Sequence, residues 1–215
     1  MKHTKPCSFN KTSPALSIHA ILSALMETFF RQGALIKTLD VSFLYDDEVF
    51  SRRYAQMSEY RRKKIDFFKF KKDKALSLGA GILMNELIEY AKKQIALQED
   101  RDKNSTVSAP DDPFTVEFSE NGKPFFAFQP NLHFSLAHAG KKVIAALSDR
   151  KIGVDVEEIS ESKDIDLAQW TRAESYVKAL DLSLSDYIEG KITLPPESRF
   201  RQWTEDDYIF AVYED

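Results

Sequence analysis

Alternating apolar and polar residues in the middle of the chain predict a buried strand with two acids on one face. In the stretch 152–157, Val154 and Val156 fall on one side because side chains alternate along a strand. Asp155 and Glu157 share the other side. Two neighbouring carboxylates repel each other unless a cation lies between them, so this face is a candidate metal site. The alternative is a polar strand face with two solvated acids.

Further strands are predicted on both sides of this one. Residues 134–139 and 143–147 read as two strands joined by a turn, and with 152–157 they predict an antiparallel meander. His138 then lies at the end of the first of these strands, where a hydrogen bond to the backbone is its simplest role. Strands are also expected at 41–45 and 208–213.

A hairpin is predicted at Glu120-Asn121-Gly122-Lys123-Pro124. Asn-Gly is the strongest short hairpin signal, because both residues tolerate positive φ. Lys123 projects beside this turn, where it can hold an anion, although most such turns are only turns.

Helical spacing predicts two further elements. Residues 170–180 form one helix, with Thr171 as the N-cap and Glu174 completing a capping box. Glu174 and Lys178 share a helix face, either as an ordinary ion pair or as a third acid beside a phosphate-binding lysine. Residues 14–32 predict an amphipathic helix that packs onto the domain or binds a partner.

Basic residues are concentrated between Arg52 and Lys74. Ten basic and three acidic residues leave this stretch with a net charge of +7, in a chain whose net charge is −4. Helical spacing places Arg61, Lys64 and Phe68 near one face. Such a patch suits an anionic ligand and an acidic protein partner, and a solvated helix face is the plain alternative. No nucleic acid partner is expected, because no recognised binding motif accompanies the charge.

The composition is that of an ordinary soluble globular protein, with 43% hydrophobic and 30% charged residues. Residues 16–30 are too interrupted by polar side chains for a membrane span or a signal peptide. The single cysteine, Cys7, supports neither a disulfide nor a zinc site, which favours a cytoplasmic protein. Residues 98–113 are expected to form a loop.

Four short motifs follow one another along the chain. They are Asn-Gly-Lys-Pro at 121–124, Phe-x-Leu-x-His at 134–138, Gly-Val-Asp-Val-Glu at 153–157 and Trp-Thr-Arg-x-Glu-Ser-Tyr-x-Lys at 170–178. In this order they resemble the 4′-phosphopantetheinyl transferases of the surfactin-synthetase-activating (Sfp) type. The segment 60–79 is also similar to that family, and the resemblance covers roughly residues 39–180.

The resemblance implies an α+β fold of two similar α/β halves, whose antiparallel sheets pack about a pseudo-two-fold axis. Residues 1–38 would be an N-terminal extension, 39–105 the N-terminal half and 106–215 the C-terminal half that carries the metal-site motifs. The implied activity is a Mg²⁺-dependent transfer of 4′-phosphopantetheine from coenzyme A to a serine of an acyl- or peptidyl-carrier protein. No membrane partner is implied.

The resemblance also assigns roles to individual residues. Glu174 and Lys178 would be catalytic, Glu174 as a metal ligand or as the base for the serine proton, and Lys178 as a phosphate contact. The implied Mg²⁺ ligands are Asp155, Glu157 and Glu174. The implied coenzyme A contacts are Lys123, His138 and Lys74.

Several positions depart from the family pattern. Ala173 stands where a lysine is usual, and an arginine usually found near Ala75 is absent. Smaller residues replace polar ones on the strand with His138, namely Ser135, Ala137 and Ala139. The connection 159–169 is also shortened. Each substitution removes a hydrogen-bonding group or a charge expected near phosphates, so a non-catalytic or decayed member that binds coenzyme A or a protein is the alternative.

Overall fold

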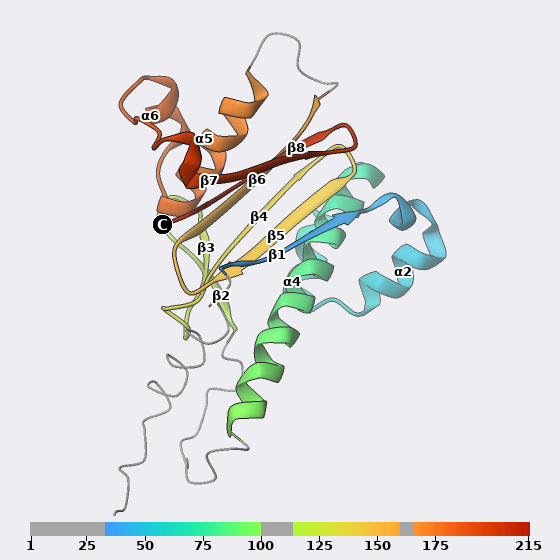
Figure 1. Ribbon diagram of the computed structural model, residues 1–215. Coiled ribbons are helices and arrows are strands. Elements are labelled where there is room, and N and C mark those ends of the chain that lie inside the picture. The colour runs from blue at the N-terminus through green and yellow to red at the C-terminus, as the bar shows by residue number, and fades with distance from the viewer. Residues whose placement is uncertain (1–32, 100–113, 160–165) are drawn as a thin grey trace, which may run out of the picture.

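The computed structural model describes residues 33–99, 114–159 and 166–215, which form a mixed α+β structure with antiparallel sheets (Figure 1). The first part of the chain contains β1 (Leu35–Asp40), the 3₁₀ helix η1 (Ser42–Tyr45), α2 (Asp47–Ala55), α3 (Glu59–Asp66) and α4 (Lys71–Glu99). The middle contains β2 (Val116–Phe118), β3 (Pro124–Phe126), β4 (His133–Ala139), β5 (Lys142–Ser148) and β6 (Ile152–Glu158). The last part contains α5 (Leu167–Leu180), α6 (Leu184–Ile188), η3 (Glu197–Arg199), β7 (Phe200–Glu205) and β8 (Tyr208–Glu214).

Two three-stranded sheets form the centre of the molecule, in the orders β1-β5-β4 and β6-β8-β7. The expected hairpin of β4 and β5 is confirmed, but the expected meander is wrong, because β6 pairs with β8 and not with β5. Strand β6 instead lies beside β4 (Figure 1). A side chain links the two sheets there: the backbone N–H of Val154 donates to Ser135 Oγ at 3.1 Å.

Strand β5 is buried over its whole length and serves two hydrophobic cores. Val143, Ala145 and Leu147 face the core formed with α4, and Ile144 and Ala146 face the core formed with β6 and β8. Helix α4 packs on the first sheet and α5 on the second (Figure 1). This double burial explains why the strand reads as a continuous apolar run and not as an alternating one.

The prediction of a strand at 41–45 is wrong. The strand here is β1, and it ends at Asp40, whose carboxylate accepts the backbone N–H of Ser42 at 2.8 Å and turns the chain. The residues that follow form η1, which buries Val41 and Leu44 against α4. Gly79 permits this close approach, because a Cβ at that position would lie 2.4 Å from Val41 Cγ1.

Helix α5 begins one turn earlier than the expected start. Asp166 is the N-cap, and its side chain accepts the backbone N–H of Gln169 at 3.0 Å. Thr171 is therefore inside the helix, where its hydroxyl donates to the Leu167 carbonyl, and the predicted cap at Thr171 is wrong. The helix ends at Asp181, which has a left-handed φ of 57°.

The basic stretch does not form one helix. Helix α3 ends at Asp66 and α4 begins at Lys71, so the predicted helical face of Arg61, Lys64 and Phe68 is interrupted before Phe68. Helix α4 also continues through Glu99, which shortens the expected loop at its start. The predicted helix at 14–32, Cys7 and the rest of that loop lie outside the described residues.

No helix in the described parts of the chain is both long and apolar enough to cross a membrane. Strand β1 begins inside the stretch expected to be an N-terminal extension, and it pairs with β5 from the other side of the expected boundary at residue 105.

Candidate metal site

Strand β6 positions the two acids of the central motif. Asp155 is opposite Ala211 of β8 and is 3% exposed, whereas Glu157 is opposite Ile209 and is half-buried. The buried part of the strand ends at Val156, so the second acid lies nearer to solvent.

Helix α5 packs against β6 at a glycine. A Cβ on Gly153 would lie 1.9 Å from the carbonyl oxygen of Ser175 and 2.4 Å from the backbone nitrogen of Ala179. Only a glycine allows the helix backbone to come this close to the strand. The close contact brings Glu174 and Lys178 over the face that carries Asp155.

Three carboxylates meet at this contact. Asp155, Glu157 and Glu174 each offer an oxygen, and these oxygens all lie within 4.8 Å of one another. Lys178 Nζ bonds Asp155 Oδ1 at 2.5 Å and Glu174 Oε2 at 2.9 Å. The structure therefore brings together all four residues that the sequence assigned to the metal and catalytic groups.

The cluster has an excess of negative charge. The pKa of Asp155 is raised from 3.8 to about 7: burial is the largest cause, Glu174 and Glu157 act in the same direction, and Lys178 opposes them. Burial lowers the pKa of Lys178, but the charges of Asp155 and Glu174 outweigh burial and raise it overall. Asp155 therefore binds its proton more tightly mainly because it is buried, and Lys178 does so because carboxylates surround its ammonium. Full ionisation leaves a net charge of −2, which one divalent cation would neutralise.

These residues fit a magnesium ion. Asp155 Oδ2 is buried and has no hydrogen-bond partner in the described structure, although such an oxygen is costly to leave unsatisfied. A cation bound between the acids would satisfy it. The donor set consists only of carboxylate oxygens, which suit Mg²⁺ and contain none of the nitrogen or sulfur ligands that favour zinc.

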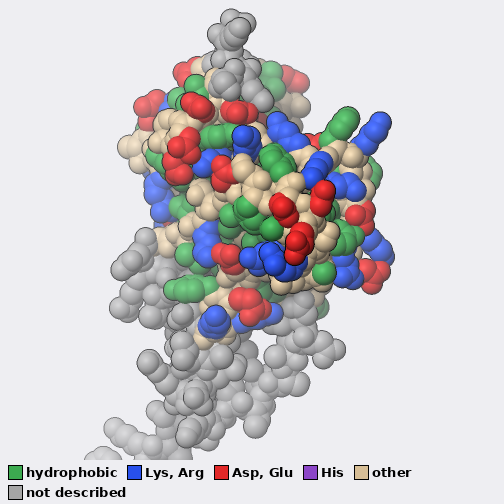
Figure 2. All heavy atoms as spheres, turned by 90° about the vertical axis from the view of Figure 1, so that its right-hand side faces the viewer, with side chains coloured by type: hydrophobic (Ala, Val, Ile, Leu, Met, Phe, Trp, Pro, Cys, Tyr) green, Lys and Arg blue, Asp and Glu red, His purple; other side chains and the backbone are tan. Residues whose placement is uncertain are grey.

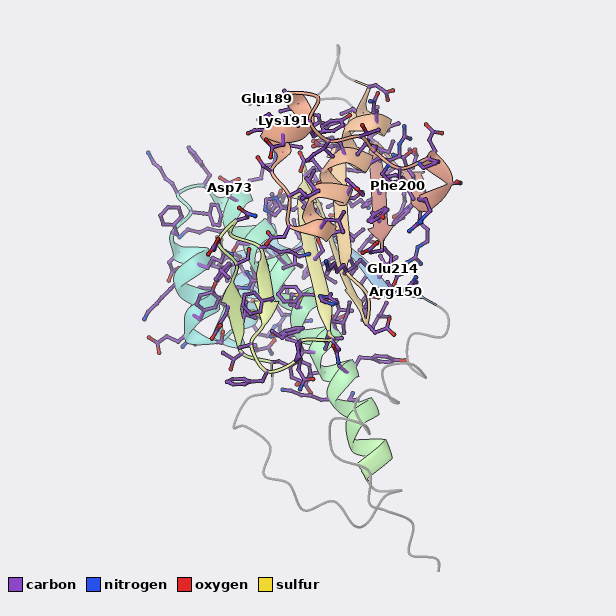
Figure 3. All side chains as sticks on the ribbon, turned by 90° about the vertical axis from the view of Figure 1, so that its left-hand side faces the viewer. Asp73, Arg150, Glu189, Lys191, Phe200 and Glu214 are labelled. Atoms are coloured by element: carbon purple, nitrogen blue, oxygen red, sulfur yellow. The ribbon has the colours of Figure 1, made fainter. Side chains whose placement is uncertain are left out.

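Strand β4 places His138 next to the cluster. His138 is exposed at the surface, but the protein around its ring partly desolvates it and lowers its pKa; the charges of Lys178 and Lys64 act in the same direction while Asp73 opposes them. The ring is thus within electrostatic reach of α5 on one side and of α3 and α4 on the other. Figure 3 shows Asp73 at the start of α4. Neighbouring positive charge of this kind favours the neutral form of the imidazole.

The β2–β3 hairpin lies against the C-terminal end of α5. Gly122 has a φ of +83° in its loop, as the Asn-Gly signal predicted. Asn121 Nδ2 donates to the Asp181 carbonyl at 2.9 Å, and Lys123 Nζ donates to the Ala179 carbonyl at 2.6 Å. Burial lowers the pKa of Lys123. This lysine therefore caps a helix end in addition to facing the site.

Two adjacent cavities lie near the acid cluster, and the smaller one reaches it at Glu174 and Lys178. One of about 340 Å³ is lined by Lys123, Ser135, Glu174, Lys178 and Asp181. The other, of about 840 Å³, is lined by Tyr60, Arg61, Lys64, Lys92 and Phe118. They share Pro124, Phe134 and Leu136 in their walls.

Lys74, a predicted coenzyme A contact, does not line either of the two cavities described above. It lies half-buried on the first turn of α4. Ala75 and Ala173, where the family usually has cationic residues, are both fully buried. Their side chains point into the protein and cannot contact a ligand at the surface.

Sequence reasoning missed two residues that shape the site. Gly153 sets the helix-to-strand distance, and a glycine inside an apolar strand was the available signal. Ser135 joins β4 to the strand that carries Asp155, and nothing in a single sequence identifies a hydrogen bond to a residue nineteen positions away.

Sequence comparison shows that the chain is similar to Sfp-type 4′-phosphopantetheinyl transferases over part of its length. The 4′-phosphopantetheinyl transferase psf-1 of Bacillus pumilus is 42% identical over 59 residues, which cover 27% of this chain and 24% of the relative. The 4′-phosphopantetheinyl transferase of Bacillus subtilis is 33% identical over 60 residues, covering 27% and 26%. The 4′-phosphopantetheinyl transferase gsp of Aneurinibacillus migulanus is 29% identical over a 100-residue alignment, covering 34% and 41%.

No family model matches the chain. The matching segments span from about a quarter to two fifths of the relatives' lengths, so the similarity concerns a part of each protein.

Proposed function

We propose that this protein transfers the 4′-phosphopantetheine group of coenzyme A to a serine of an acyl- or peptidyl-carrier protein, with Mg²⁺ as cofactor. The observation that carries the proposal is the acid cluster of Asp155, Glu157 and Glu174, with a buried carboxylate oxygen that lacks a partner. The similarity to 4′-phosphopantetheinyl transferases supports it independently of the geometry.

The proposed step exchanges one phosphorus–oxygen bond for another. The serine oxygen bonds to the phosphorus that carries the pantetheine arm, and the bond from that phosphorus to the bridging pyrophosphate oxygen breaks. The products are the modified carrier protein and 3′,5′-ADP. Neutralising the charge on the pyrophosphate is the chemistry that Mg²⁺, held by the three acids, supplies when bound.

The residues of the cluster have separate tasks in this step. Glu174 is 20% exposed at its side chain, so it can both face the ion and accept the serine proton, directly or through water. Lys178 holds Asp155 and Glu174 in place and offers a positive charge to a phosphate. His138 and Lys123 flank the cluster and would contact the coenzyme A phosphates.

The shape of the neighbouring cavities supports a long anionic ligand. Glu174 and Lys178 line the smaller cavity, and Arg61 and Lys64 line the larger one together with aromatic side chains. Burial and the charge of Arg61 lower the pKa of Lys64, so an anion would be favoured beside this pair. A nucleotide with several phosphates could extend from one cavity to the other.

The test is incubation of the purified protein with coenzyme A, Mg²⁺ and a panel of apo-carrier proteins. Mass spectrometry should show that one phosphopantetheine has been added to a carrier, and that Asp155→Asn and chelator each abolish the addition. A matched control is Asp207→Asn, which changes an exposed aspartate near the β7–β8 turn. Transfer that continues in Asp155→Asn would contradict the proposal.

Two buried alanines favour a second candidate, a non-catalytic module on the same fold. The resemblance implies a lysine at the position of Ala173 and an arginine near Ala75, and this sequence has neither. Titration of coenzyme A with Mg²⁺ separates the candidates, because metal-dependent binding without transfer to any carrier would support the module.

A further inference from the structure

The turn between α3 and α4 presents two phenylalanines to solvent. Phe67 is 87% exposed and Phe70 is 65% exposed, although large apolar side chains usually avoid such exposure unless they meet a partner. The turn, residues 67–70, is held by local backbone bonds: Phe68 N–H donates to the Ile65 carbonyl, and Lys74 N–H donates to the Phe70 carbonyl. Its shape is therefore fixed before any partner arrives.

The aromatic rings support one another within this turn. Phe67 meets Phe68 edge to face, with centroids 6.1 Å apart. Lys69 Nζ lies 5.8 Å from the centre of the Phe70 ring. Phe68 is half-buried and fixes the turn to the domain, which leaves Phe67 and Phe70 as the two outward anchors.

The surroundings of the turn are strongly basic. Residues 61–74 contain eight basic and two acidic side chains, a net charge of +6 in a chain of net charge −4. Figure 2 shows lysine and arginine side chains, with hydrophobic and acidic ones among them, on the side of the molecule that carries α2. Exposed aromatic anchors inside a basic rim fit an acidic surface with an apolar centre.

The turn also lies at the edge of the candidate site. Lys64 of α3 and Gly81 of α4 line the larger cavity, which shares three residues with the smaller cavity that Glu174 and Lys178 line. The helices on either side of the turn thus form one wall of the cavity next to the site. An acceptor protein that delivers a serine to the acid cluster would come within reach of this turn.

We infer that the turn at residues 67–70, with its rim of lysines and arginines, is the docking surface for the acceptor protein. The inference rests on the proposed function. The acceptor places an acidic surface against the basic rim and one or two apolar side chains against Phe67 and Phe70.

The test compares the wild type with the double variant Phe67→Ser, Phe70→Ser. Both side chains are exposed, so the fold and coenzyme A binding should not change, which circular dichroism and titration calorimetry check. The KM for the carrier protein should rise about tenfold or more, while kcat at saturating carrier stays within about twofold. The KM should also rise with salt concentration in the wild type.

A matched control is Ile188→Ser. Ile188 is also 65% exposed but lies on α6, on the other side of the sheets from α4 (Figure 1). Its substitution should leave the KM unchanged. An unchanged KM in the double phenylalanine variant would overturn the inference.

Two further results would distinguish failure of the docking inference from failure of the proposed transferase function. If the wild type binds coenzyme A with Mg²⁺ but neither binds nor modifies any carrier protein, the proposed transfer and the docking inference are both wrong. That result would support the non-catalytic module. If the double variant loses sedimentation with anionic vesicles while its KM for the carrier is unchanged, the turn is a membrane contact and the inference is wrong.

Discussion

Replacing Asp155 by asparagine tests the electrostatics of the acid cluster without any assumption about the reaction. The pKa of this carboxyl is raised from 3.8 to about 7, first by burial and then by Glu174 and Glu157. Between these two values the folded protein holds a proton that the unfolded chain has lost. The free energy of unfolding therefore falls as the pH rises through this window, and the trend ends above the folded pKa.

The size of the change in the free energy of unfolding follows from the pKa shift of Asp155. Each pH unit inside the window changes the free energy of unfolding by about 1.4 kcal/mol. Raising the pH from 6 to 8 in chelator should therefore cost the wild type about 1.4 kcal/mol through Asp155 alone, since the trend levels off near pH 7. The whole penalty at pH 8 is about 4 kcal/mol. Asparagine carries no ionisable proton and should remove this contribution.

Urea unfolding at pH 6 and pH 8 measures the difference. The pH dependence of Asp155→Asn should be smaller than that of the wild type by about 1.4 kcal/mol, and the variant should be the more stable of the two at pH 8. Asp207→Asn should keep the dependence of the wild type. Saturating Mg²⁺ should restore stability at pH 8 in the wild type and not in Asp155→Asn. Equal pH dependence in Asp155→Asn and the wild type would refute the reasoning.

Three other substitutions test the surroundings of the cluster. Gly153→Ala forces the new methyl group against the Ser175 carbonyl, so it should lower the free energy of unfolding by about 3 kcal/mol and weaken Mg²⁺ binding, measured by urea unfolding and calorimetry. Lys178→Met removes the charge that opposes burial, so the pKa of Asp155 should rise above 7 and the pH window of the stability change should extend upward; an unmoved window would contradict this. Tyr208→Phe removes a hydroxyl that accepts a backbone N–H at 3.0 Å and bonds a glutamate at 3.2 Å, and it should cost about 1 kcal/mol with Mg²⁺ affinity unchanged.

Local patterns in the sequence were enough to predict the elements that carry the candidate site. Strands β4, β5, β6 and β8 and helix α5 occur where periodicity and turn signals placed them. The i,i+4 spacing of Glu174 and Lys178 does place both on one face of α5, and Asp155 and Glu157 do face them. These features depend on residues close together in the chain, and short-range geometry fixes them.

Long-range pairing was not predictable in this way. Strand β6 pairs with β8, more than fifty residues later, and no local pattern specifies that choice. Strand β7 was missed because it is an edge strand with most of its side chains partly exposed, so it lacks clear alternation. At 41–45 the strand propensity of the residues was overridden by the Asp40 turn and by burial of Val41 against α4.

The shared burial of β5 bears on how the protein opens. Its backbone bonds β1 on one edge and β4 on the other, and its side chains enter both hydrophobic cores. Because both cores contain side chains of β5, displacing this strand exposes both of them to water. The two cores should therefore unfold as one cooperative unit. The amide hydrogens of β5 should then exchange with solvent only through global opening, and they should be the last in the molecule to do so.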